Sequence, residues 1–279
     1  MTATESPVIS SSRDLWRQIV VLLSAVIAVV VSFLGSGAVV GTPVSEVAGG
    51  VLDSDATLVA PGGAAFAIWG VIYTGLLLLG LNQAMSWRRT DARQRRTGWW
   101  ITASALLNAA WIAAVQLAWL VVSVVLLIAL VAVLVIIMIR LNERPATTRY
   151  EAVVVDGTVG LYLGWACIAT VANSAAAGLD AGIAATGTIA LWSAVVVLVV
   201  AAVVGVVLAV GLKGRLAPAI GLGWGLAWVA VERASGIPQA PVVAIVAAAA
   251  AAVTVLAAVV VRARFGPSAV RENQAVRDF

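Results

Sequence analysis

The stretch TGWWITASALLNAAWIAAVQLAWLVVSVVLLIALVAVLVIIMI runs from Thr97 to Ile139 without a charged residue. A helix crosses the roughly 30 Å hydrocarbon core of a bilayer in about 20 residues, so this run is too long for one crossing. Backbone groups in lipid must bond internally, which leaves helices or closed barrels, and the run lacks the alternation of a barrel strand. We therefore expect two membrane helices that fold back around Gln116 to Trp119.

The whole chain has the composition of a membrane protein. Hydrophobic residues make up 62% of it and charged residues 11%, against roughly 45–50% and 25% in soluble domains. These values predict an all-α, polytopic membrane protein. Apolar runs place its eight helices near residues 18–40, 61–85, 98–117, 119–140, 153–175, 186–211, 216–232 and 240–261. The seventh span is short and contains Pro218.

The distribution of basic residues tests this count independently, because cytoplasmic loops are enriched in Lys and Arg. With the N-terminus in the cytoplasm, eight helices leave 16 of the 17 basic residues inside, and only Arg233 lies outside. We expect a multi-pass protein of the cell membrane with both termini cytoplasmic. Nearly every Arg borders an apolar run, so the net charge of +4 indicates lipid headgroups as partners and no nucleic acid.

The segment from Gly41 to Gly63 is the longest outside connection. It contains Glu46, Asp53 and Asp55 and no basic residue. It can be a solvated loop or a lid over an outward-facing cavity, and from the residues alone we favour the solvated loop. The polar tail after Arg264 is expected to be disordered.

Aromatic and amide residues recur at helical spacing inside three of the spans. Positions separated by three, four, seven and eleven residues share one helix face. The stripes comprise Phe66, Trp69 and Tyr73 on the second span; Asn108, Trp111, Val115 and Trp119 on the third; and Tyr162, Trp165, Ala169 and Asn173 on the fifth. Asn108 and Asn173 would be costly facing lipid, so the stripes should face the bundle interior. Helix packing and pocket lining both remain open at this point.

Groups suited to catalysis are scarce. The chain has no histidine and a single cysteine, Cys167, which excludes an intramolecular disulfide and the usual His or Cys metal sites. Glu151 and Asp156 open the fifth span, but at its cytoplasmic end, where water can solvate them. We therefore expect no enzyme, no cofactor and no metal. The scarcity of intramembrane charges argues against a proton-coupled pump, but a facilitator for a neutral solute remains open.

The three stripes resemble the tryptophan-rich sensory protein family, also known as TspO, translocator protein or peripheral benzodiazepine receptor. The family's fifth-helix pattern P-Y-L-x-W-x-x-x-A-T-x-x-N is similar to Leu161–Asn173, which lacks only the leading proline. The third-helix N-x-x-W is similar to Asn108 through Trp111. The second-helix proline and W-x-x-x-Y are similar to Pro61, Trp69 and Tyr73.

The resemblance covers about residues 18–175 and implies a five-helix bundle. It gives four domains: a cytoplasmic tail over residues 1–17, the bundle over 18–175, three additional helices over 176–262 and a polar cytoplasmic tail over 263–279. The longer bacterial proteins of the family have such a length. Phe66 is one position out of register with the family's P-x-W-x-F, and the aromatic pair after N-x-x-W is replaced by Val115 and Gln116.

The resemblance also implies a pocket for a planar hydrophobic ligand such as a porphyrin or another tetrapyrrole. The residues carried over as ligand-binding or pocket-supporting are Trp69, Tyr73, Asn108, Trp111, Tyr162, Trp165, Ala169 and Asn173. Flat π-systems stack on Trp and Tyr, while amides orient a ligand. The protein would then be a sensor or a transporter-like protein of the bacterial inner membrane.

Two alternatives remain open. One is a small-solute permease that uses all eight helices, for which Thr186, Thr188, Ser193 and Thr254 are the polar residues of the last three spans. The other is a membrane assembly protein, which could form a homodimer through Gly221-x-x-x-Gly225 and the alanine-rich last helix.

Overall fold

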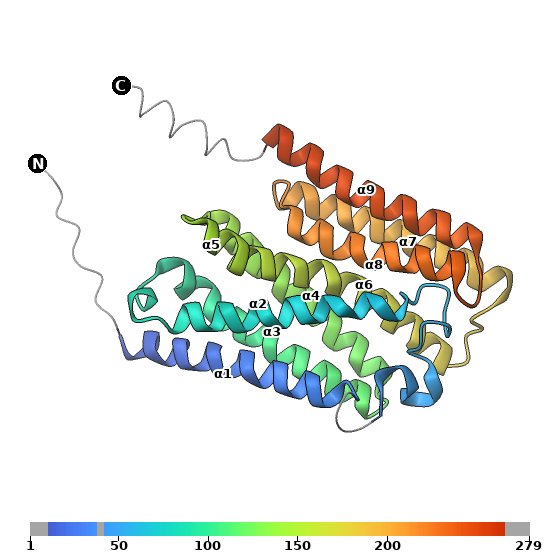
Figure 1. Ribbon diagram of the computed structural model, residues 1–279, viewed down its shortest axis with the longest axis horizontal. Helices are drawn as coiled ribbons and strands as arrows, with labels where there is room; N and C mark the ends of the chain where they lie inside the picture. The colour runs from blue at the N-terminus through green and yellow to red at the C-terminus, as the bar shows by residue number, and fades with distance from the viewer. Residues whose placement is uncertain (1–10, 38–41, 266–279) are drawn as a thin grey trace, which may run out of the picture. The chain divides into compact units, whose positions relative to one another are not determined.

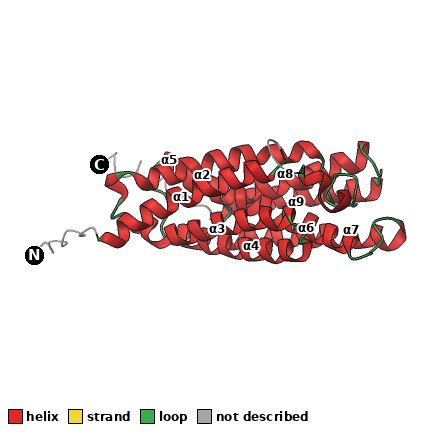
Figure 2. Ribbon diagram, turned by 90° about the horizontal axis from the view of Figure 1, so that it is seen from below, coloured by secondary structure: helices red, strands yellow, loops and turns green. Residues whose placement is uncertain are grey.

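The computed structural model describes residues 11–37 and 42–265, and within these residues all regular secondary structure is helical (Figure 2). The chain forms two compact units. The first comprises residues 1–51 and 67–159, and the second comprises residues 52–66 and 160–279. The connection that was expected outside therefore contributes to both units, since it is divided after residue 51.

Four long helices make up most of the first unit. They are α1 (Ser12–Gly35), α2 (Ile68–Ala84), α3 (Ala92–Gln116) and α4 (Leu120–Glu143). Short 3-10 turns, η1 (Val44–Gly50) and η3 (Ser86–Arg88), lie between them. Helix α1 packs against α2 and α3, and α3 packs against α4.

The uncharged run from Thr97 to Ile139 folds back as expected. Helix α3 ends at Gln116 and α4 begins at Leu120. In the turn, Ala118 has a positive φ of 55°, and the Trp119 amide donates to the Ala114 carbonyl at 2.8 Å. The predicted helical hairpin and its turn are confirmed.

One face of α4 is buried along its whole length. Five of its fully buried residues recur at alternating spacings of three and four: Leu127, Leu130, Leu134, Ile137 and Leu141. This is the spacing by which one helix presents a continuous apolar stripe to a neighbour. Most residues between them are more exposed, which suits a helix with a lipid-facing side.

Helix α1 begins earlier than the expected span of 18–40. The Asp14 carboxylate accepts hydrogen bonds from the Ser11 amide and hydroxyl, both at 3.0 Å, which satisfies groups at the helix N-terminus. The helix therefore includes residues 12–17, which were expected in the tail, and it ends at Gly35. Residues 38–41 lie outside the described residues, as does the tail from residue 266.

The fifth expected span is longer and less regular than predicted. A short helix, α5 (Arg149–Glu151), leads into a π-helical turn, η4 (Ala152–Gly157), and then into α6 (Thr158–Asp180). π-Helical turns inside helices are uncommon and frequently occur at functional sites. The first unit ends within this stretch, at Val159.

The second unit contains α6 and three further helices, α7 (Gly187–Gly211), α8 (Leu216–Ser235) and α9 (Pro241–Phe265). Helix α9 packs beside α7 and α8, as Figure 1 shows for these three labels. The 3-10 turn η2 (Gly63–Ala67) begins in this unit.

Glycines allow α6 and α8 to approach at backbone distance. A methyl group at Gly164 would lie 2.5 Å from the Leu222 amide nitrogen and would also meet the Pro218 carbonyl. From the other side, a methyl group at Gly221 would lie 3.0 Å from the Trp165 amide nitrogen. Small residues four apart are the usual means by which membrane helices pack this closely.

Among the residues that the structure describes, seven segments are long and apolar enough to cross a membrane. They are Ser12–Gly35, Gly63–Ala84, Ala92–Gln116, Leu120–Glu143, Arg149–Asp180, Gly187–Gly211 and Pro241–Phe265. This supports a polytopic membrane protein. The expected seventh span forms a regular helix, α8, but is not among the seven, since Glu232 and Arg233 stand in its last turns. The count of eight spans and the side of each terminus stay predictions.

The compact units do not follow the domain boundary expected at residue 175. Helix α6, the expected fifth helix of the bundle, belongs almost entirely to the second unit. The domain division rests on the family resemblance and stays a prediction.

Candidate functional site

Three aromatic rings of the first unit stack on one another. Trp69 lies at the centre, with its ring 4.9 Å from Tyr73 at 17° and 5.7 Å from Trp111 at 25°. Trp69 and Tyr73 are separated by one helical turn on α2, while Trp111 comes from α3. The stripes predicted on these two helices therefore meet. Trp111 is buried, whereas Trp69 and Tyr73 are half-buried.

The amide of Asn108 supports this aromatic cluster, which we define as Trp69, Tyr73 and Trp111. Asn108 is fully buried, and its Nδ2 donates to the Ser32 hydroxyl at 3.0 Å and to the Tyr73 hydroxyl at 3.3 Å. Its Oδ1 is buried without a hydrogen-bond partner. Buried acceptors are normally bonded, so Asn108 combines a fixed side-chain orientation with an unused acceptor.

The other four predicted site residues lie on α6 in the second unit. Tyr162, Trp165, Ala169 and Asn173 are all buried, as their shared helix face predicted. The Asn173 Nδ2 donates to the Ala169 carbonyl at 2.9 Å, one turn earlier on the same helix. The Asn173 Nδ2 therefore makes a hydrogen bond within α6. The structure brings the predicted residues together in two groups of four, one in each unit.

Phe66 departs from the predicted stripe. It lies in the 3-10 turn η2 instead of the α-helix that follows, so the α-helical spacing to Trp69 does not apply to it. Its ring meets Trp165 edge-on, with a centroid distance of 5.6 Å and an angle of 80°. Phe66 thus belongs with the aromatic side chains of α6.

The segment 52–66 is bound to α8 and is not simply a solvated loop. The Trp224 indole donates to the Ala65 carbonyl at 2.8 Å, and the Gly62 amide donates to the Trp228 carbonyl at 3.4 Å. Residues 57–62 are buried, whereas the acidic part of the connection is largely accessible. The expectation of a solvated loop is therefore wrong for residues 57–62, which pack within the second unit.

Arg233, the one basic residue that the sequence analysis expects outside, is fully buried. Its guanidinium donates to three carbonyls: Ser54 at 2.5 Å, Pro238 at 3.2 Å and Ile237 at 3.3 Å. It therefore joins the end of α8 to the segment 52–66 and to the α8–α9 connection. A guanidinium presents five donors in a fixed fork, which suits this convergence of carbonyls. The sequence showed the isolated charge but not this structural role.

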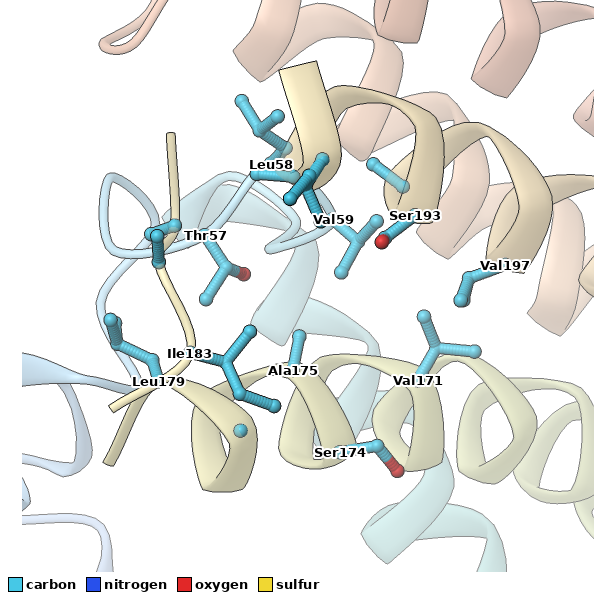
Figure 3. A pocket seen from close by; sticks show the side chains of 16 residues that line it. Thr57, Leu58, Val59, Val171, Ser174, Ala175, Leu179, Ile183, Ser193 and Val197 are labelled. Atoms are coloured by element: carbon cyan, nitrogen blue, oxygen red, sulfur yellow. The ribbon is translucent and has the colours of Figure 1, made fainter. Parts of the chain in front are cut away.

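A cavity of about 330 Å³ lies in the second unit (Figure 3). Its lining comes from the segment 57–59, from the second half of α6 and the turn after it, and from the first half of α7. Most lining groups are apolar, and the hydroxyl-bearing residues are Thr57, Ser174 and Ser193. None of the predicted site residues lines it.

Charged side chains gather at one end of the first unit. Arg93 pairs with Asp156 and Arg88 pairs with Glu151, and both carboxylates are buried. The expectation that water solvates Glu151 and Asp156 is therefore wrong, because arginines from the α2–α3 region neutralise them instead. Asp14 accepts from Arg17 at 3.0 Å and from Arg95 at 2.6 Å in the same unit. These pairs hold α1, α3 and the start of the fifth span together.

Three of the residues named for the two alternative functions, Thr254, Gly221 and Gly225, pack within the second unit, whereas Thr186, Thr188 and Ser193 are exposed. Thr254 is fully buried on α9, where its side chain fills the space beside Gly205 on α7. Gly221 and Gly225 face Leu161, Trp165 and Ile168 of α6. The Gly221-x-x-x-Gly225 pair is therefore already used in a contact within the chain. No group of three or more His, Cys, Asp or Glu residues that could hold a metal occurs in the part of the chain that the structure describes.

Comparison with known proteins places these features in a family. No curated protein and no solved structure matches the chain. A protein-family model described as TSPO-like protein matches residues 18–260, which is most of the 279 residues. The match extends beyond the expected limit at residue 175 and includes α7, α8 and most of α9. The chain, including its last three helices, thus belongs to the TSPO-like protein family.

Proposed function

We propose that this membrane protein binds a planar hydrophobic molecule, with a tetrapyrrole as the first candidate, against the aromatic cluster Trp69, Tyr73 and Trp111. The observation that carries the proposal is the stack around Trp69, in which two rings are only half-buried. Aromatic rings in offset stacks attract one another by about 0.5–1.5 kcal/mol beyond their buried area. A flat ligand can add a further ring to this stack in the same stacked arrangement.

Asn108 gives the proposed site its polar element. Its Nδ2 is engaged by Ser32 and Tyr73, which fix the side chain, while its Oδ1 has no partner. Ligand pockets typically combine apolar walls with a few polar groups that set orientation. A pyrrole N–H or another ligand donor would satisfy the Oδ1. Tyr162, Trp165, Ala169 and Asn173, which lie on α6 in the second unit, are proposed as further ligand-binding residues.

In the experiment, the purified protein in nanodiscs is titrated with protoporphyrin. Binding is measured as the shift of the porphyrin absorption band. Trp69→Leu should weaken binding about threefold to tenfold, the equivalent of one aromatic stack. Trp87→Leu is the matched control, because Trp87 is 73% exposed in the turn η3. Equal binding by both variants, or no saturable binding by the native protein, would refute the proposal.

The same proposal includes eight membrane helices with both termini in the cytoplasm. Such a protein could sense its ligand or move it across the membrane. Flux measurements in proteoliposomes separate these roles, since a sensor binds protoporphyrin without moving it. A permease for small polar solutes would instead show solute flux that protoporphyrin does not inhibit.

A further inference from the structure

We propose that the cavity between the segment 57–59, α6 and α7 is a second ligand site, which takes an apolar molecule with a single hydroxyl or carbonyl group. This cavity has no residue in common with the aromatic cluster. The inference therefore does not depend on tetrapyrrole binding. It uses α7, one of the three last helices whose role the sequence left open.

Shape and lining define the apolar part of the ligand. The cavity of about 330 Å³ lies at the small end of the range for ligand pockets, roughly 300–1,000 Å³. Its walls are mainly small aliphatic groups, including Val59, Ala175, Ile183 and Val197, which Figure 3 shows around one space. None of the described residues that line it is charged, so an ionic ligand would lose its hydration without compensation.

Thr57 defines the polar part of the ligand. The residue is only 6% exposed, and its Oγ1 is buried without a hydrogen-bond partner. Figure 3 shows this hydroxyl directed toward the space between Val59 and Ala175. Burying an unbonded hydroxyl costs roughly 1–3 kcal/mol. A ligand oxygen would remove this cost, because a hydroxyl both donates and accepts.

The other two hydroxyls of the lining differ in availability. Ser174 donates to the Thr170 carbonyl on its own helix at 2.7 Å, and in Figure 3 its oxygen points away from the cavity. Ser193 stands on α7, on the side of the cavity opposite α6, and is exposed. The buried, unpartnered Thr57 is therefore the specific anchor. The exposed wall of α7, with Ile189 at 80% exposure, gives an apolar ligand a route from the lipid.

The test uses a diazirine derivative of farnesol, an isoprenoid alcohol, as a photolabel on the protein in nanodiscs. Labelled peptides are mapped by mass spectrometry. Farnesol and farnesane, the saturated hydrocarbon with the same carbon skeleton, are each used as competitors of the label. We expect labelling within residues 57–59 and 171–197, and competition by farnesol at concentrations at which farnesane has no effect. Label spread evenly over the lipid-facing helices would overturn the proposal. Equal competition by farnesane would also overturn it, because the site would then bind hydrocarbon chains with no preference for a hydroxyl group.

Two variants test the anchor and the cavity separately. Thr57→Val keeps the shape, removes the hydroxyl and should raise the half-competing farnesol concentration about threefold to tenfold, the loss of one hydrogen bond. Ala190→Leu fills the cavity and should abolish specific labelling. The controls are Thr74→Val, an exposed threonine of α2, and Ala202→Leu, which lies on α7 away from the cavity. Unchanged competition in Thr57→Val, with both controls native-like, would refute the role of Thr57.

Discussion

Gly164 of α6 lies directly against the backbone of Leu222 in α8. A side chain on Gly164 would place its first carbon 2.5 Å from the Leu222 nitrogen, closer than any real side chain approaches. Gly221 makes the reciprocal contact with α6. The two helices therefore meet through their backbones, and the position of Trp165, the residue that follows Gly164, depends on this contact.

Gly164→Ala is expected to destabilise the protein by about 1–3 kcal/mol, because the methyl group must push two backbones apart. The midpoint of thermal unfolding in detergent, followed by tryptophan fluorescence, measures the effect. Gly70→Ala is the control, since nothing lies within 4 Å of the added methyl group. The control should be neutral or should gain up to about 1 kcal/mol from helix propensity. An equal change in both variants would contradict the close contact of α6 with α8.

Arg233→Met is expected to release the segment 52–66 from α8. The substitution removes donors to three carbonyls, and hydrogen bonds of charged groups contribute roughly 1.5–3 kcal/mol each. Hydrogen exchange should become faster in residues 52–66, with little change in α4. Arg264→Gln at the exposed end of α9 should leave the exchange unchanged. Slow exchange in Arg233→Met would show that this arginine does not hold the segment.

Asp156→Asn is expected to destabilise the first unit by about 3–5 kcal/mol, because it leaves the buried Arg93 without its counter-charge. The double variant Arg93→Gln with Asp156→Asn should recover much of that loss, since no buried charge remains unpaired. Chemical unfolding in mixed detergent micelles measures both.

The exposed ion pair of Arg96 and Glu143 is the control for the buried pair of Arg93 and Asp156. Its side chains are 48% and 49% exposed, so Glu143→Gln should change stability by less than about 1 kcal/mol. If Asp156→Asn were equally mild, the Arg93 pair would have to be solvated, contrary to its burial.

The membrane crossing of α8 can be tested with single cysteines in a Cys167→Ala background. If α8 spans the membrane, Ile237→Cys should react with an impermeant maleimide in intact cells, while Lys213→Cys should react only after permeabilisation. Ile237 is 76% exposed, so neighbouring residues would not block the reagent from a cysteine at this position. Labelling of both positions from the same side would leave seven spans and would place the termini on opposite sides.

Most of the helical architecture could be predicted from the sequence. Long uncharged runs that lack the alternation of a barrel strand satisfy their backbone in lipid as helices, and all eight expected segments are helical over most of their described residues. The turn between Gln116 and Leu120 was predictable because the run exceeds the thickness of a bilayer. Boundaries were less predictable, as α1 shows, since the bonds of Asp14 to Ser11 depend on side-chain geometry.

The candidate site was predictable only in part. Helical periodicity correctly placed Trp69, Tyr73 and Trp111 on faces that meet, and it correctly buried Tyr162 and Trp165. It could not show that Phe66 lies in a 3-10 turn, because that turn precedes the regular helix. Nor could it reveal Thr57, a single hydroxyl in a segment without periodicity.

The sequence by itself determined that this chain is a bundle of apolar helices of the TSPO-like kind, because hydrophobic run length and motif spacing are local properties. The tertiary structure decided which groups meet across the chain. Arginines of α3 and η3 neutralise the carboxylates that open the fifth span, Arg233 gathers carbonyls from Ser54 and the α8–α9 connection, and the segment 57–59 closes a cavity against α6 and α7. Such contacts join residues far apart in sequence, and no local pattern encodes which distant partner satisfies a buried polar group.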